Sequence, residues 1–138
     1  MSEFKVSKDV AESEFERFVE EMDLLVDENE MDAEDRTAYG RQRQRIVRAI
    51  QKGDLVINED GEAVYTPSHR NAPYKEPITF YERTGATVME MDGKKANQAM
   101  RKTYAVMGAM CRVPPSVFAN MIGTDIKVCE AIYALLMD

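Results

Sequence analysis

The chain has 138 residues, of which 44% are hydrophobic and 31% charged, with a net charge of −7 at pH 7. This length corresponds to about one domain of roughly 100–200 residues, and the composition is that of a globular protein. The longest apolar run, residues 131–137, falls far below the roughly 20 residues of a membrane helix. Because the first residues also lack a signal-peptide pattern, we expect a cytoplasmic protein that contacts no membrane.

The charges are distributed unevenly along the chain. Residues 1–66 carry 18 acidic and 9 basic residues, whereas residues 67–138 carry 7 and 9. Within the first part, residues 12–35 contain twelve acids and one base, and residues 36–52 contain six bases and no acid. An acidic protein repels nucleic acid overall, although a local basic patch can still bind it. Nucleic acid is therefore a disfavoured partner.

The first predicted helix runs from about Ser7 or Asp9 to Val26. Its apolar residues recur at three- and four-residue spacings and form one face, while acidic residues cover most of the remainder. Two interpretations stay open: a surface helix packed on the core, or a partner-binding helix with an acidic rim. In the second interpretation the contact residues are Phe15, Phe18 and Met22.

A second helix is predicted from Asp32, which fits an N-cap, to about Lys52, with Gly53 as its C-terminal stop. The acids of its first turn and the bases of its last turn suit the helix dipole.

Four arginines follow one another on this second helix, and three of them, Arg41, Arg45 and Arg48, share a face, whereas Arg43 points elsewhere. Such a patch can bind phosphates. Alternatively, the basic helix lies antiparallel to the acidic first helix, within one chain or between subunits, and the charges pair. We favour charge pairing, with Arg41, Arg45 and Arg48 as the partners.

Residues 55–57 and 63–65 predict a β-hairpin, because Asp60-Gly61 between them is a strong turn signal. Residues 78–81 predict a further strand that can add to the hairpin and make a three-stranded sheet.

The segment 67–77 contains three prolines and predicts a linker. It divides the chain into an N-terminal region of charged helices and hairpin, residues 1–66, and a strand plus helical region, residues 78–138. The two regions can still form one compact domain.

Everything after Arg83 is predicted to be helical, with segments near 86–91, 94–110, 116–121 and 125–136. The expected fold class is therefore α+β and mainly α. It comprises two N-terminal helices, a small antiparallel sheet in the middle and a helical C-terminal half.

Few residues offer catalytic chemistry. His69 stands in a polar loop, and Cys111 and Cys129 stand among apolar helix residues with no base beside them. We assign both thiols to the core in reduced form. The acids of residues 12–35 lack the spaced ligands and central glycine of a calcium loop. We expect no enzymatic activity, no cofactor and no metal.

Seven of the ten methionines lie after residue 85. Methionine is flexible and fills both irregular cores and adaptable interfaces. The sequence leaves open whether the apolar residues of this region are core or face a partner; they include Met100, Tyr104, Met107, Ile132 and Leu136.

Three segments of the C-terminal half carry a family pattern. Residues 78–92 read as a strand, a Thr-Gly turn and a short helix. Residues 107–117 read as a helix that breaks at Pro114-Pro115, and residues 122–137 as a polar turn with Asp125 before an apolar final helix. In this order the segments resemble small tail assembly chaperones of long-tailed bacteriophages.

The resemblance covers about residues 77–138, and residues 1–66 match no such pattern. It implies a non-enzymatic role in virion morphogenesis. Such chaperones bind the tape measure protein and tail tube subunits during tail assembly. They self-associate, often as rings or spirals, and are absent from the finished virion. We therefore expect a homo-oligomer in the host cytoplasm.

Two other functions remain as alternatives. The first is a small phage or bacterial regulatory protein that binds nucleic acid or a protein partner through the helix carrying Arg41 to Arg48. The second, an enzyme that uses carboxylate pairs as acid and base, has the least support, because no nucleophile, base and orienting group can be assembled from the sequence.

Overall fold

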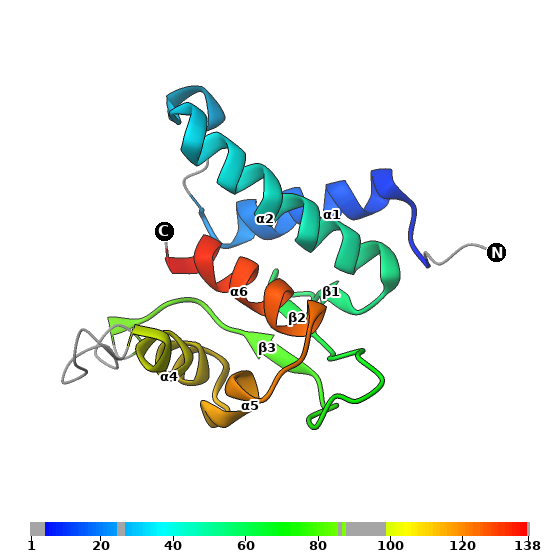
Figure 1. Ribbon diagram of the computed structural model, residues 1–138. Helices are drawn as coiled ribbons and strands as arrows, with labels where there is room; N and C mark the ends of the chain where they lie inside the picture. Colours follow the sequence, from blue (N-terminus) through cyan, green and yellow to red (C-terminus); the bar gives the residue numbers. More distant parts are fainter. Residues whose placement is uncertain (1–4, 25–26, 86, 88–98, 138) are drawn as a thin grey trace.

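The computed structural model describes residues 5–24, 27–85, 87 and 99–137, and of residues 99–101 the backbone only (Figure 1). The elements in chain order are α1 (Lys8–Glu21), the 3₁₀ turn η1 (Glu28–Glu30), α2 (Ala33–Lys52), β1 (Leu55–Ile57), β2 (Ala63–Tyr65), β3 (Ile78–Phe80), α4 (Ala99–Cys111), α5 (Ser116–Ala119) and α6 (Thr124–Met137). The predicted fold class is confirmed: the fold is α+β, mainly α, with a small antiparallel sheet in the middle. Within the described ranges no helix combines the length and apolarity needed to cross a membrane.

Both ends of α2 are where the sequence predicts them. The carboxylate of Asp32 accepts a hydrogen bond from the backbone N–H of Asp35 at 2.7 Å, which makes Asp32 the N-cap. Gly53 follows the helix in the left-handed conformation with φ of 84°, as a C-terminal glycine does.

The first helix is shorter than predicted and does not extend to Val26. Asp23 adopts a left-handed φ of 52°, and the N–H of Leu24 bonds back to the carbonyl of Val19 at 3.0 Å. This pattern closes a helix by satisfying its last carbonyls, so α1 ends two residues before Asp23.

The helices α1 and α2 run in opposite directions and pack against each other (Figure 1). Near the start of the chain, the N–H of Lys5 bonds to the carbonyl of Gln51 at 2.7 Å. Further along, the rings of Phe15 and Tyr39 lie 6.4 Å apart. The antiparallel arrangement predicted for the acidic and basic helices is therefore present within one chain.

The sheet has the order β1-β2-β3, with both strand pairs antiparallel. Leu55 pairs with Tyr65, and Tyr65 pairs in turn with Ile78. The first and third residues of each strand are buried, so one face of the sheet packs on the core. The hairpin and the third strand are both confirmed.

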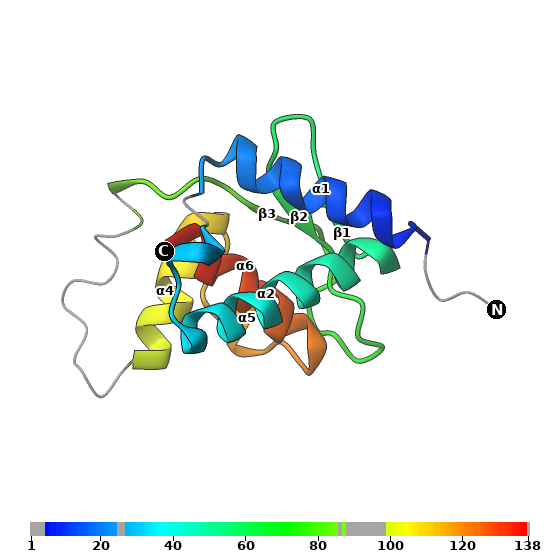
Figure 2. The same ribbon diagram turned by 90° about the horizontal axis from the view of Figure 1, so that it is seen from above.

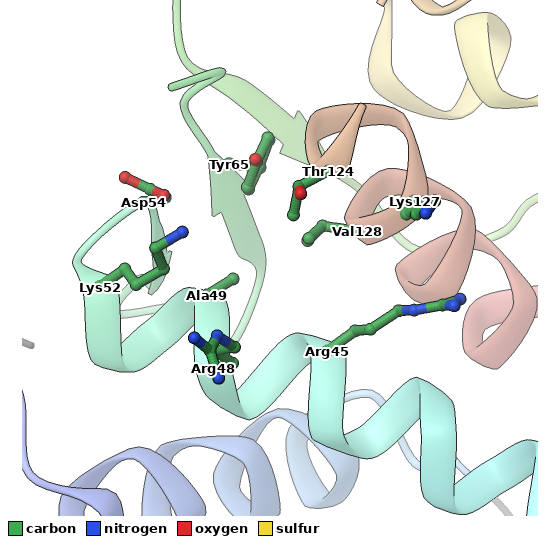
Figure 3. A pocket seen from close by; sticks show the side chains of 9 residues that line it. All are labelled: Arg45, Arg48, Ala49, Lys52, Asp54, Tyr65, Thr124, Lys127 and Val128. Atoms are coloured by element: carbon green, nitrogen blue, oxygen red, sulfur yellow. The ribbon is translucent and has the colours of Figure 1, made fainter. Parts of the chain in front are cut away.

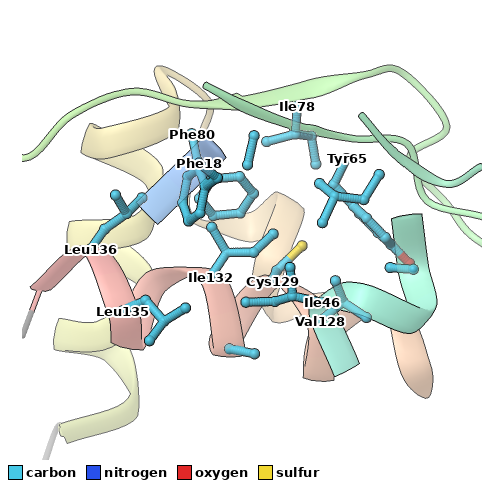
Figure 4. Close-up of a cluster of buried hydrophobic side chains, with 14 of the residues drawn as sticks. Phe18, Ile46, Tyr65, Ile78, Phe80, Val128, Cys129, Ile132, Leu135 and Leu136 are labelled. Atoms are coloured by element: carbon cyan, nitrogen blue, oxygen red, sulfur yellow. The ribbon is translucent and has the colours of Figure 1, made fainter. Parts of the chain in front are cut away.

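Helix α6 is the central element of the molecule (Figure 1 and Figure 2). Its buried side chains, Ile132 among them, lie between the sheet and α2 (Figure 4). A single core cluster joins Phe18 of α1, Ile46 of α2, Phe80 of β3 and Phe118 of α5 to this helix. The core thus takes residues from both sides of the predicted linker.

The chain folds back sharply after α4, as the Pro-Pro step predicts. At Gly108 an added Cβ would lie 2.7 Å from the carbonyl oxygen of Val113, so only glycine allows this close approach. Helix α5 starts at Ser116 and ends at Ala119, two residues earlier than predicted. The predicted helix 86–91 and the first residues of the predicted helix 94–110 lie outside the described residues, apart from Thr87.

Two glycines provide a matched pair of expected effects on stability. Gly40 lies inside α2 with nothing within 4 Å of an added Cβ, so Gly40→Ala is expected to stabilise the protein by about 1 kcal/mol. Gly61, in the hairpin turn, has φ of 80°, and its Cβ would collide with the side chain of Glu21. Gly61→Ala is therefore expected to destabilise by about 2 kcal/mol. Urea unfolding followed by circular dichroism measures both, and an equal effect of the two changes would contradict this assignment.

Both cysteines are buried, 4% and 0% exposed, and both are free thiols, as the sequence predicts. Burial raises the pKa of Cys111. Burial is also the main cause of the raised pKa of Cys129, to which the charges of Cys111 and Asp125 add.

These raised pKa values make stability depend on alkaline pH. The unfolded thiols ionise near pH 8.5, whereas the folded thiols stay protonated, so their stabilisation is complete below that pH and is lost as pH rises. We expect each thiol to contribute a loss of about 1.4 kcal/mol per pH unit above about pH 9. Urea unfolding from pH 8 to 10 should show a shallower decline for Cys129→Ala than for the unsubstituted protein, and an unchanged slope would refute the prediction.

Candidate functional site

The facing sides of α1 and α2 are joined by ion pairs of Arg43. Its guanidinium lies 2.9 Å from a carboxylate oxygen of Glu12 and 3.5 Å from one of Glu16. It also lies 5.4 Å from the centroid of the Phe15 ring, within the range of a cation–π contact. The predicted charge pairing between the helices is present. The residue that makes these two ion pairs is Arg43, which by its helical spacing does not share the face of Arg41, Arg45 and Arg48.

The three apolar residues proposed as partner contacts on α1 are part of the core. Phe15 and Phe18 are 0% exposed and Met22 is 8% exposed. Since α2 and β1 pack against α1, the apolar face of this helix is covered within the chain. The interpretation of a helix packed on the core therefore replaces that of a partner-binding face.

For the apolar residues of the C-terminal half, the sequence left open whether they belong to the core or face a partner. The structure places most of them in the core. Met107, Ile132 and Leu136 are buried, and Tyr104 is partly buried against the core. Met100 belongs to α4, but its side chain is outside the described residues. Met107, Ile132 and Leu136 therefore belong to the core, and Tyr104 packs against it with part of its side chain exposed.

The remaining three predicted residues, Arg41, Arg45 and Arg48, are exposed on α2. Two of them line a cavity of about 310 Å³ between the C-terminal half of α2 and the first turns of α6 (Figure 3). We call this cavity the cationic groove; its lining residues are Arg45, Arg48, Ala49, Lys52, Asp54, Tyr65, Thr124, Lys127 and Val128.

The cationic groove carries a strong local positive charge in an acidic protein. Four of its residues are basic and one, Asp54, is acidic, which gives a formal charge of +3, against −7 for the whole chain. Arg41 extends the row of bases on α2 by a further turn. Such a charge attracts anionic groups and raises the rate at which an anionic partner associates.

The α6 wall of the groove is fixed in place by a buried carboxylate. Asp125, 1% exposed, accepts hydrogen bonds from the Tyr65 hydroxyl at 2.5 Å and from the N–H groups of Ser68 and His69 at 3.0 and 3.1 Å. Three donors satisfy the buried charge, as burial of a carboxylate requires. These bonds hold the start of α6, which carries Lys127, against β2 and against the predicted linker.

The tyrosine of this cluster is kept in its protonated form. Burial is the largest cause of the raised pKa of Tyr65, and the hydrogen bond to Asp125 and its charge raise it further. The Tyr65 hydroxyl is therefore a donor to Asp125 throughout the neutral pH range. His69 accepts a hydrogen bond from the N–H of Asn71 at 3.0 Å through Nδ1 and is partly buried.

Sequence reasoning missed three residues of this site. The spacing of Lys52 continues the row of Arg41, Arg45 and Arg48, and this spacing is the signal that could have found it. Lys127 is a base and Asp125 an acid near the start of a mostly apolar helix. Each is an exception to its local pattern, which marks it for closer attention.

A second cavity of about 690 Å³ lies on the other side of α2, between α1 and α2. It is lined by both acids and bases, including Glu12 and Glu16, which pair with Arg43. The cationic groove is therefore the stronger candidate for binding a charged partner.

Comparisons of the chain with protein-family models, with curated proteins and with solved structures find no match.

Proposed function

We propose that this chain is a non-enzymatic tail assembly chaperone of a long-tailed bacteriophage. In this function it self-associates and binds the tape measure protein and tail tube subunits in the host cytoplasm during virion morphogenesis. The proposed function belongs to the whole chain, including the charged helices α1 and α2.

The observation that carries the proposal is the order of elements after residue 77. Strand β3 leads to a turn in which the hydroxyl of Thr84 accepts a hydrogen bond from the N–H of Thr87 at 3.2 Å. Helix α4 then ends just before Pro114-Pro115, and Gly123, with φ of 60°, precedes α6. The described elements of this succession agree in order with the pattern by which the sequence resembles such chaperones, whose short helix after the Thr-Gly turn lies outside the described residues.

The experiment is co-expression with the tape measure protein of the phage genome that carries this sequence. We expect the tape measure protein to stay soluble and to co-purify with the chain. A chain of similar size and net charge but unrelated sequence is the control for a general solubility effect. Equal insolubility with and without the chain would overturn the proposal.

Light scattering after size exclusion, at low and high salt, tests self-association. A multimer is expected, and one that weakens at high salt indicates charge-mediated contacts. A mass of 15.7 kDa at every concentration would remove self-association without a client from the proposal.

The cationic groove favours a second function, that of a small regulatory protein that binds nucleic acid or a protein partner through α2. It predicts retention on DNA or RNA that weakens steeply with salt. The engagement of Arg43 with Glu12 takes one of the four arginines away from a nucleic-acid surface, which makes this the weaker of the two.

A further inference from the structure

We propose that the cationic groove is a docking site for an acidic helical segment of a protein partner. The inference rests on the proposed function, because it gives the chemistry of the client segment that the chain would bind. It is carried by the geometry of α2 and α6 and by the charge of the residues between them.

The length of the basic row fits an elongated ligand. Arg41, Arg45, Arg48 and Lys52 follow at steps of four, three and four residues along one face of α2. At 1.5 Å per residue this row spans about 16 Å. A partner helix with carboxylates at the same steps presents a matching face over three turns.

The basic side chains are spread along the groove rather than gathered at one point. In Figure 3, Arg45, Arg48 and Lys52 leave α2 in different directions, and Lys127 stands on the opposite helix. A compact anion such as a single phosphate is held best by donors that converge on it. A distributed set of charges instead fits several carboxylates at successive turns of a helix.

The floor of the groove is apolar and nearly inaccessible. It is formed by Ala49, Val128 and Tyr65, which are 3%, 2% and 1% exposed. The apolar contact open to a partner helix therefore comes from the aliphatic parts of the arginine and lysine side chains. Amphipathic helices bind in grooves of this kind by combining such contacts.

The surroundings of the groove disfavour nucleic acid. The chain carries −7 overall, and on its other side α2 faces a cavity whose three acids are balanced by three bases. A polyanion therefore meets a positive surface along the basic row only. A single peptide helix, about 10–12 Å across with its side chains, can lie along that row.

The test uses the full chain and a fluorescently labelled, helix-forming peptide with glutamates at matching steps of four, three and four residues. The control peptide has glutamine at the same four positions. We expect the acidic peptide alone to bind in fluorescence anisotropy, and its affinity to fall about tenfold or more between low and high salt. No binding of the acidic peptide at low salt would overturn the inference.

A matched pair of variants locates the binding. Arg45→Gln with Lys127→Gln removes two charges from the groove, and Lys75→Gln with Lys102→Gln removes two charges elsewhere. We expect the first pair to weaken peptide binding about tenfold and the second to change it less than about twofold. Circular dichroism confirms that both variants fold. An equal loss in both variants, or tighter binding of a short oligonucleotide than of the peptide, would overturn the inference.

The same groove variant separates this inference from the proposed function. If the unsubstituted chain retains the tape measure protein and the groove variant retains it equally well, the docking site is wrong and the chaperone function stands. If the peptide binds in the groove but the tape measure protein is not retained, the site stands and the chaperone function fails.

Discussion

Phe18→Ala is expected to lower the free energy of unfolding by about 3–5 kcal/mol. The ring of Phe18 is 0% exposed and contributes to the core that joins α1 to the sheet and α6 (Figure 4). Its removal takes away buried apolar surface and leaves a cavity that the neighbouring helices fill only in part. Urea unfolding followed by circular dichroism measures the loss.

The control for Phe18 is on the same helix. Val10 is 53% exposed, so Val10→Ala is expected to change stability by less than about 0.5 kcal/mol. The comparison also tests the placement of the apolar face of α1. A small effect of Phe18→Ala on stability together with a loss of partner binding would instead show that the apolar face of α1 contacts a partner.

Asp125→Ala is expected to cost about 3 kcal/mol. The carboxylate accepts three hydrogen bonds at the start of α6, and its removal leaves the buried Tyr65 hydroxyl without its acceptor. A buried polar group that loses its partner costs roughly 1–3 kcal/mol, and the freed N–H groups of Ser68 and His69 add to this. Unfolding in urea at neutral pH measures the effect.

Tyr65→Phe is the matched variant for this cluster. It removes one donor and keeps the carboxylate bonded to the two N–H groups, so the expected cost is about 1 kcal/mol. If Asp125→Ala were no more costly than Tyr65→Phe, the carboxylate would not be the residue that holds the linker and α6 together.

The elements that the sequence predicted well are specified by short-range signals. Asp32 and Gly53 fix the two ends of α2, and Asp60-Gly61 fixes the hairpin. Each signal acts through backbone conformation within a few residues, so it can be read without knowledge of the rest of the chain. The end of α1 was missed because an aspartate, Asp23, takes the left-handed conformation that glycine usually marks.

The candidate site was only partly predictable, because it depends on contacts between distant segments. Helical spacing shows which arginines share a face, but not that Arg43 is the one that faces Glu12. The bond between Tyr65 and Asp125 joins residues 60 positions apart, and Lys127 reaches the basic row only because α6 packs on α2. An apolar stripe likewise does not reveal whether the chain itself covers it, which is why Phe18 stayed undecided.

The central position of α6 has a consequence for synthesis of the protein. The sheet strands β1 and β2 end at Tyr65, whereas α6, which covers their inner face, is complete only at Met137. At a translation rate of about 5–20 residues per second, the ribosome needs roughly 4–14 seconds to add the intervening stretch. During this interval the apolar sides of α2 and the hairpin lack their cover, and the nascent chain is at its most vulnerable to aggregation.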